Sequence, residues 1–145
     1  MPVRDPDEVF VKPGEVPAAC QGELHPLALK GIELFDQREY WDAHEALEAA
    51  WLDEAGPARH LYKGILQAGV TYLHIERGSF VGMAKMFERS KKWLAPWPDH
   101  CRGLDIGRLR RDLTQAVAHA GQLGPDKLDQ FDRKLYRKIR RLGAE

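Results

Sequence analysis

The stretch that decides the fold is YWDAHEALEAAW, residues 40–51. It contains neither Gly nor Pro and is rich in Ala, Leu and Glu, so it predicts a helix. At about 100° per residue, one stripe of this helix has the spacing of a core-facing surface. The stripe consists of Tyr40, His44, Leu47 and Trp51. Glu48 borders it, and because an unpaired buried polar group costs about 1–3 kcal/mol, His44 and Glu48 both need partners.

The composition is that of one globular domain. The chain has 145 residues, of which 43% are hydrophobic and 30% are charged. The first residues, MPVRDPDE, do not resemble a signal peptide, and no apolar run approaches the roughly 20 residues that span a bilayer. Cys20 and Cys101 match neither a metal-binding pair nor a disulfide framework. We therefore predict a cytoplasmic protein without membrane contact.

The two parts of the chain carry opposite charge, although the net charge is zero. Residues 1–56 hold 13 acidic and 4 basic residues, whereas residues 57–145 hold 9 acidic and 18 basic residues. Either the acidic part packs against the basic part, or the basic part presents a face to an anionic partner. We favour the first interpretation, because charge runs are usually solvated faces.

The apolar residues follow helical spacing throughout, and period-two alternation is absent, so we predict an all-α fold without a sheet. The expected architecture is a compact single-domain array of five or six helices. The expected helices span about 26–35, 40–55, 58–77, 80–95, 106–123 and 128–142. The third should be central, because its apolar sector exceeds half of its circumference. Ser79 and Asp105 are expected to cap the helices that follow them.

Three segments are expected along the chain. Residues 1–24 contain Pro2, Pro6, Pro13 and Pro17 and predict an extended arm, pinned by Val9, Phe10 and Val11. Residues 25–124 form the helical core. Residues 125–145 are expected to form a basic amphipathic helix with an apolar stripe of Leu128, Phe131, Leu135, Ile139 and Leu142.

The last helix must dock, because an isolated helix of this length is marginal in water. The expected docking surface is the body of the same chain. The alternatives are a second subunit, which would make a homo-oligomer, or an anion such as nucleic acid, since six of the nine residues 133–141 are basic. Nucleic acid is disfavoured, because no recognised reading motif accompanies these charges.

The candidate site lies between the second and third expected helices. A short connection makes them antiparallel, so the stripe of His44 and Glu48 could face Gln67, Thr71 and His74. Two His and one Glu are a common ligand set for zinc and for facial-triad iron. The candidate metal ligands are therefore His44, Glu48 and His74, for zinc, iron or manganese. The other residues of interest are Glu45 as a candidate general base, and Gln67, Lys63, Tyr40 and Trp51 as a polar cluster.

Two functions remain open. In the first, the chain is a metal-dependent hydrolase in which the metal lowers the pKa of a bound water toward about 7. In the second, the chain is a non-catalytic binding or scaffold domain, the cluster is a buried hydrogen-bond network, and the basic C-terminal segment is the contact surface. The spacing favours the network, since it matches neither His-Glu-x-x-His nor the Glu-x-x-His pairs of di-iron bundles.

Residues 31–94 resemble the bacterial and archaeal family called domain of unknown function 309. The motif Phe-Asn-x-Gly-x-Tyr-aromatic-x-x-His-Glu-x-x-Glu-x-x-Trp corresponds to residues 35–51. A second block, Gly-Leu-Ile-Gln followed by a His seven residues after the Gln, corresponds to residues 64–67 and His74. A Gly-Asn pair and a Gly-Ala helix start then follow in the family, at residues 78–79 and 82–83 here. The departures are all at turns or helix starts: Asp36 for Asn, Arg38 for Gly, Ser79 for Asn and Met83 for Ala. The resemblance implies a compact all-helical protein, and members of the family often carry the label "predicted metal-dependent hydrolase", which hints at a metal-dependent activity.

Overall fold

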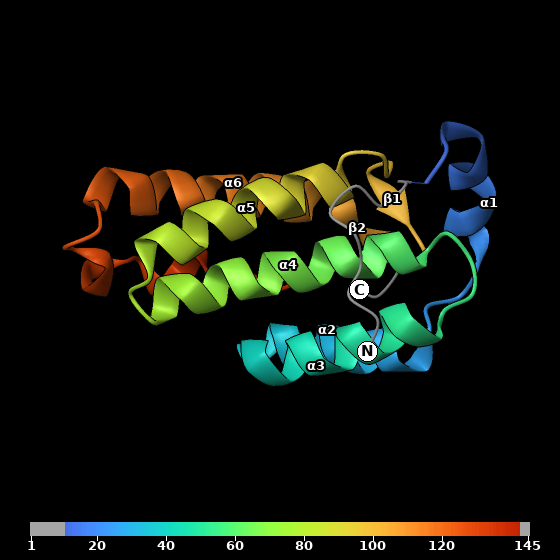
Figure 1. The fold of residues 1–145 in the computed structure, drawn as a ribbon, viewed down its shortest axis with the longest axis horizontal. Helices are drawn as coiled ribbons and strands as arrows, with labels where there is room; N and C mark the ends of the chain where they lie inside the picture. The colour runs from blue at the N-terminus through green and yellow to red at the C-terminus, as the bar shows by residue number, and fades with distance from the viewer. Residues whose placement is uncertain (1–10, 143–145) are drawn as a thin grey trace.

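Six α-helices make up most of the fold in the computed structural model, which describes residues 11–142. Their order is shown in Figure 1. The elements are η1 Pro13–Glu15, α1 Val16–Gln21, α2 Pro26–Asp36, α3 Tyr40–Asp53, α4 Arg59–Glu76, α5 Phe80–Leu94, β1 His100–Cys101, β2 Leu104–Asp105, α6 Ile106–Leu123, η2 Leu128–Gln130 and η3 Arg133–Leu135. The predicted all-α class is confirmed. The only strands in the described part are the two residues each of β1 and β2, which pair antiparallel.

Helix α4 is central, as its wide apolar sector predicts. It contributes eleven buried residues and lies between α3 on one side and α5 on the other (Figure 1). Gly64 lets α5 approach closely, because a Cβ there would lie 2.7 Å from Leu94 Cδ2 and 3.3 Å from the Leu94 nitrogen. Gly31 does the same for α2 and α3, since its Cβ would lie 2.6 Å from Leu47 Cγ.

Two helix starts follow local sequence signals. The Asp105 carboxylate accepts a hydrogen bond from the Arg108 backbone N–H at 2.9 Å, so the predicted cap of α6 is confirmed. Ser79 stands at the N-cap of α5, but its side chain makes no capping hydrogen bond. That part of the prediction is wrong, and α5 begins without a side-chain cap.

The prediction of an extended N-terminal arm over residues 1–24 is wrong for residues 13–21, which are helical. Residues 1–10, including Val9 and Phe10 of the predicted anchor, lie outside them. Residues 13–21 form η1 and α1 instead of extended chain, because each element carries a proline in its first turn, where the missing N–H costs nothing. Val11 is buried, as expected of an anchor.

The cysteines form a disulfide, which corrects the prediction that they do not pair. Cys20 at the end of α1 is bonded to Cys101 in β1, and their Cα atoms are 4.5 Å apart. They are separated by 81 residues in sequence. Nothing local reveals such a pairing, because it depends on how the hairpin of β1 and β2 folds back onto α1.

The basic C-terminal helix predicted for residues 125–145 is wrong over residues 125–142, and residues 143–145 lie outside the described residues. The chain makes η2 and η3, and then runs as an extended segment between the α2–α3 pair and α6. Its backbone groups find partners elsewhere in the fold. The Ile139 N–H donates to Asp36 Oδ1 at 2.8 Å, and the Leu142 N–H donates to the Gly103 carbonyl at 2.8 Å. The segment still docks on the body, because Leu128, Phe131, Leu135 and Ile139 are all buried.

No helix within residues 11–142 is both long enough and apolar enough to cross a bilayer.

Candidate functional site

His44 and Glu48 lie one turn apart on α3, as predicted. His44 Nε2 is 3.7 Å from Glu48 Oε2, which is a loose ion-pair distance rather than a hydrogen bond. Their side chains are 23% and 36% exposed, and the His44 ring packs 5.1 Å from the ring of Trp41. His44 Nδ1 is buried without a hydrogen-bond partner. The pair therefore lies at the edge of the core rather than inside it.

The α4 residues of the predicted cluster, Gln67, Thr71 and His74, lie in the core or against neighbouring residues. His74 packs against the start of α5, since a Cβ on Gly82 would lie 2.5 Å from His74 Nδ1. Burial, and secondarily the charge of Arg77, lower the pKa of His74. Gln67 is buried, and its Oε1 has no hydrogen-bond partner. The Thr71 hydroxyl donates to the Gln67 backbone carbonyl at 2.8 Å, so this hydroxyl serves its own helix.

The three predicted metal ligands do not form one cluster. Within residues 11–142, no group of three or more His, Cys, Asp or Glu side chains is arranged to hold a metal ion. His44 and Glu48 approach each other, whereas His74 faces Gly82. Helical spacing placed these residues correctly along their helices, but it could not predict the tilt of His74 toward α5.

The other predicted site residues, Lys63, Tyr40 and Glu45, differ in their contacts and burial. Lys63 Nζ lies 4.9 Å from the ring centre of Trp51 and 4.0 Å from that of Trp93, which is cation–π geometry. Tyr40 is 1% exposed and stacks on Tyr72 with ring centres 5.4 Å apart. Burial raises the pKa of Tyr40 strongly, so it stays neutral. Glu45 is exposed at the surface of α3.

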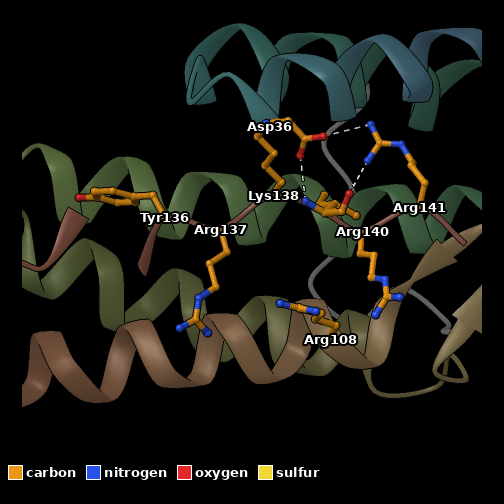
Figure 2. A pocket seen from close by; sticks show the side chains of 8 residues that line it. Asp36, Arg108, Tyr136, Arg137, Lys138, Arg140 and Arg141 are labelled. Carbon is orange, nitrogen blue, oxygen red and sulfur yellow. Dashed lines mark hydrogen bonds and ion pairs between the residues drawn. The ribbon is translucent and has the colours of Figure 1, made fainter. Parts of the chain in front are cut away.

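A second candidate site, which we call the basic cleft, lies where the C-terminal segment passes between α2 and α6 (Figure 2). It is an open depression of about 800 Å³. Its lining consists of Asp36, Arg108, Tyr136, Arg137, Lys138, Ile139, Arg140 and Arg141. Five of these eight side chains are cationic and one is acidic.

Several cations of the basic cleft are held in place by carboxylates behind them. Arg137 donates to Asp112 Oδ1 at 3.0 Å and to Gln115 Oε1 at 2.7 Å. Arg141 pairs with Asp36 at 3.2 Å. Burial is the main influence on Asp36 and raises its pKa, against the lowering effects of the Ile139 N–H and of Arg141. The guanidinium groups are therefore oriented before any ligand arrives.

Two residues that contact the lining of the basic cleft, Asp112 beside Arg137 and Tyr72 beside Tyr136, contain buried polar atoms that lack hydrogen bonds. Asp112 Oδ2 has no hydrogen-bond partner, and Arg108 Nε lies 3.6 Å from it. The hydroxyl of Tyr72 is also buried without a partner. Burial raises the pKa of Tyr72, and the charges of Asp112 and Arg137 act on it as well. Unpartnered buried polar atoms are rare in folded proteins, so they mark this region as unusual.

Part of the chain is similar to a known protein family. Residues 28–86 match the family model described as Domain of unknown function (DUF309). This match confirms the family resemblance expected from the motifs of residues 35–51 and 64–74. No curated protein matches the chain.

The matched range 28–86 contains the predicted His/Glu residues but little of the basic cleft. Of the cleft residues, only Asp36 lies within the matched range 28–86. The basic run of residues 133–141 was visible in the sequence, but a helix would have spread its charges around the helix axis. Only the extended backbone brings this run alongside Arg108 and Asp36 in one depression.

Proposed function

We propose that this chain is a non-catalytic binding domain that holds a phosphate-bearing anion in the basic cleft. The observation that carries the proposal is the excess of cationic over acidic side chains lining one open depression. Guanidinium groups present planar pairs of donors that match phosphate oxygens, which suits Arg-rich sites to phosphate.

The arrangement of the cations supports this proposal. Arg108 is about half exposed, with 47% of its side chain accessible, and Lys138 is exposed, so both can reach a ligand. Arg137 is held by Asp112, and Arg141 by Asp36. Binding then immobilises fewer flexible side chains, and an anion loses less of its affinity to their ordering.

Calorimetric titration with sodium tripolyphosphate tests the proposal. The double variant Arg108→Ala/Lys138→Ala should bind at least tenfold more weakly than the wild type, which corresponds to about 1.4 kcal/mol. The matched control is Lys85→Ala/Arg89→Ala on the exposed surface of α5, which changes the net charge equally. Equal weakening in both variants would indicate a general charge effect, and the proposal would be wrong.

A divalent metal at His44 and Glu48 is the second candidate. It is favoured by the 3.7 Å approach of His44 Nε2 to Glu48 Oε2. The hydrolase activity predicted from the sequence depends on such a metal. Metal analysis of tag-free protein should then find one equivalent of zinc, iron or manganese that is lost in His44→Ala. A folded, metal-free wild-type protein would contradict this candidate.

The proposed location is the cytoplasm, as the composition predicts. Disulfides in that reducing compartment are usually transient or redox-responsive. The Cys20–Cys101 bond would accordingly be reversible there, and this bears on the chemistry of its two sulfur atoms.

A further inference from the structure

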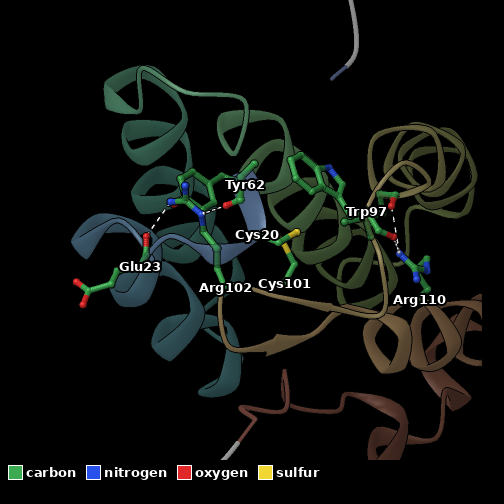
Figure 3. Close-up of a disulfide and its surroundings, with 9 residues drawn as sticks. Cys20, Glu23, Tyr62, Trp97, Cys101, Arg102 and Arg110 are labelled. Atoms are coloured by element: carbon green, nitrogen blue, oxygen red, sulfur yellow. Dashed lines mark hydrogen bonds between the residues drawn. A yellow bond between two sulfur atoms is a disulfide. The ribbon is translucent and has the colours of Figure 1, made fainter. Parts of the chain in front are cut away.

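The two halves of the disulfide differ in their surroundings (Figure 3). Cys101 is 2% exposed and belongs to the core, whereas Cys20 is only partly buried at the end of α1. Cys20 also lines an apolar depression of about 570 Å³, which we call the proline groove. Its lining is Pro13, Val16, Pro17, Cys20, Pro96, Trp97, Pro98 and His100.

Because of this difference in exposure, the sulfur of Cys20 is the one that a thiolate can reach. Thiol–disulfide exchange begins when a thiolate attacks one sulfur of the bond, and access decides which one. The proline groove gives a small molecule a path to Cys20. Cys101 is not among the residues that line the proline groove, and it packs within the core.

We propose that Cys20 is a reversible modification site for a low-molecular-mass thiol. The thiolate of the small molecule attacks Cys20 Sγ and forms a mixed disulfide with it. The Cys20–Cys101 bond breaks, and its electron pair leaves on Cys101 Sγ, which then takes up a proton. A second thiolate attacks the sulfur of the bound small molecule, which gives the small-molecule disulfide and releases the Cys20 thiolate.

The surrounding hydrogen bonds keep the two cysteines together after the bond opens. The Arg102 backbone N–H donates to the Cys20 carbonyl at 2.9 Å. The Arg102 side chain donates to the Ala19 carbonyl at 2.6 Å and to the Glu23 carbonyl at 2.7 Å. These bonds hold α1 on the hairpin without the disulfide, so the same bond can form again on reoxidation. This inference does not depend on anion binding in the basic cleft.

The test uses the folded wild-type protein and reduced glutathione as the probe. After brief exposure, remaining thiols are alkylated, and the two cysteine-containing peptides are examined by mass spectrometry. The expected result is glutathione on Cys20 and the alkyl group on Cys101, with the Cys20 adduct at least tenfold in excess. Predominant or equal glutathione on Cys101 would overturn the proposal. So would a disulfide that glutathione opens only after denaturant is added, or cysteines that are unpaired in the purified protein.

A variant tests the role of Arg102 in reversibility. In Arg102→Ala, reoxidation after removal of glutathione should slow several-fold while the circular dichroism spectrum stays helical. Equal reoxidation rates in a folded variant would show that Arg102 does not hold α1 in place. The site of the adduct remains the test of the modification itself.

Discussion

A chain that ends at Gly124 is expected to lose its native fold. The deletion removes four buried apolar side chains, namely Leu128, Phe131, Leu135 and Ile139. Full burial of one such side chain contributes about 1.5–3 kcal/mol, so their combined loss is comparable with the 5–15 kcal/mol of a typical domain. It also exposes the surfaces of α2, α4 and α6 that these residues cover.

Thermal melting followed by circular dichroism measures this effect. The matched control ends at Leu142 and retains every described contact of the C-terminal segment. The Gly124 variant should be insoluble or melt without a cooperative transition, whereas the control should melt as the wild type does. An unchanged, cooperative melting curve for the Gly124 variant would mean that the C-terminal segment is not part of the folded body.

Loss of the disulfide is the second large effect. The bond closes a loop of 81 residues, and the chain-entropy model assigns such a loop about 4 kcal/mol of stabilisation. Because Arg102 holds the same segments together, we expect a measured loss of about 2–4 kcal/mol in Cys20→Ala/Cys101→Ala.

Urea unfolding with and without a reductant isolates this contribution. The wild type should lose stability when the reductant is added, while the double alanine variant should be indifferent to it. If the reductant leaves the unfolding midpoint of the wild type unchanged, the disulfide contributes nothing to the folded state.

Much of the helical core could be predicted because its signals are local. The apolar sector of residues 58–77 predicted a central helix, and Asp105 predicted the start of α6. The motif of residues 35–51 predicted the family. Each of these inferences depends on residues within a few turns of one another, where the geometry of a helix relates sequence spacing to direction.

The backbone conformation of the C-terminal segment could not be predicted from local spacing. Apolar residues at 128, 131, 135 and 139 have helical spacing, and all four are buried. The spacing indicated burial but not backbone conformation. Backbone N–H groups of this segment bond to distant residues, such as Ile139 N–H to Asp36, instead of to carbonyls one helical turn earlier. Asp132 reinforced a turn by accepting the Lys134 N–H at 3.0 Å.

The candidate sites depend on contacts that are distant in sequence. Ile139 bonds to Asp36 across 103 residues, and Cys20 bonds to Cys101 across 81. One sequence gives no information on such pairs. The position of His74 along α4 likewise did not reveal that its ring faces Gly82.

The most direct test of anion binding in the basic cleft is a nuclear magnetic resonance titration of isotope-labelled protein with tripolyphosphate. If the anion binds there, the largest amide shifts will occur in residues 136–141 and around Arg108 at the start of α6, and Lys85 and Arg89 on α5 will be unaffected. The absence of shifts, or shifts centred on α5, would contradict it.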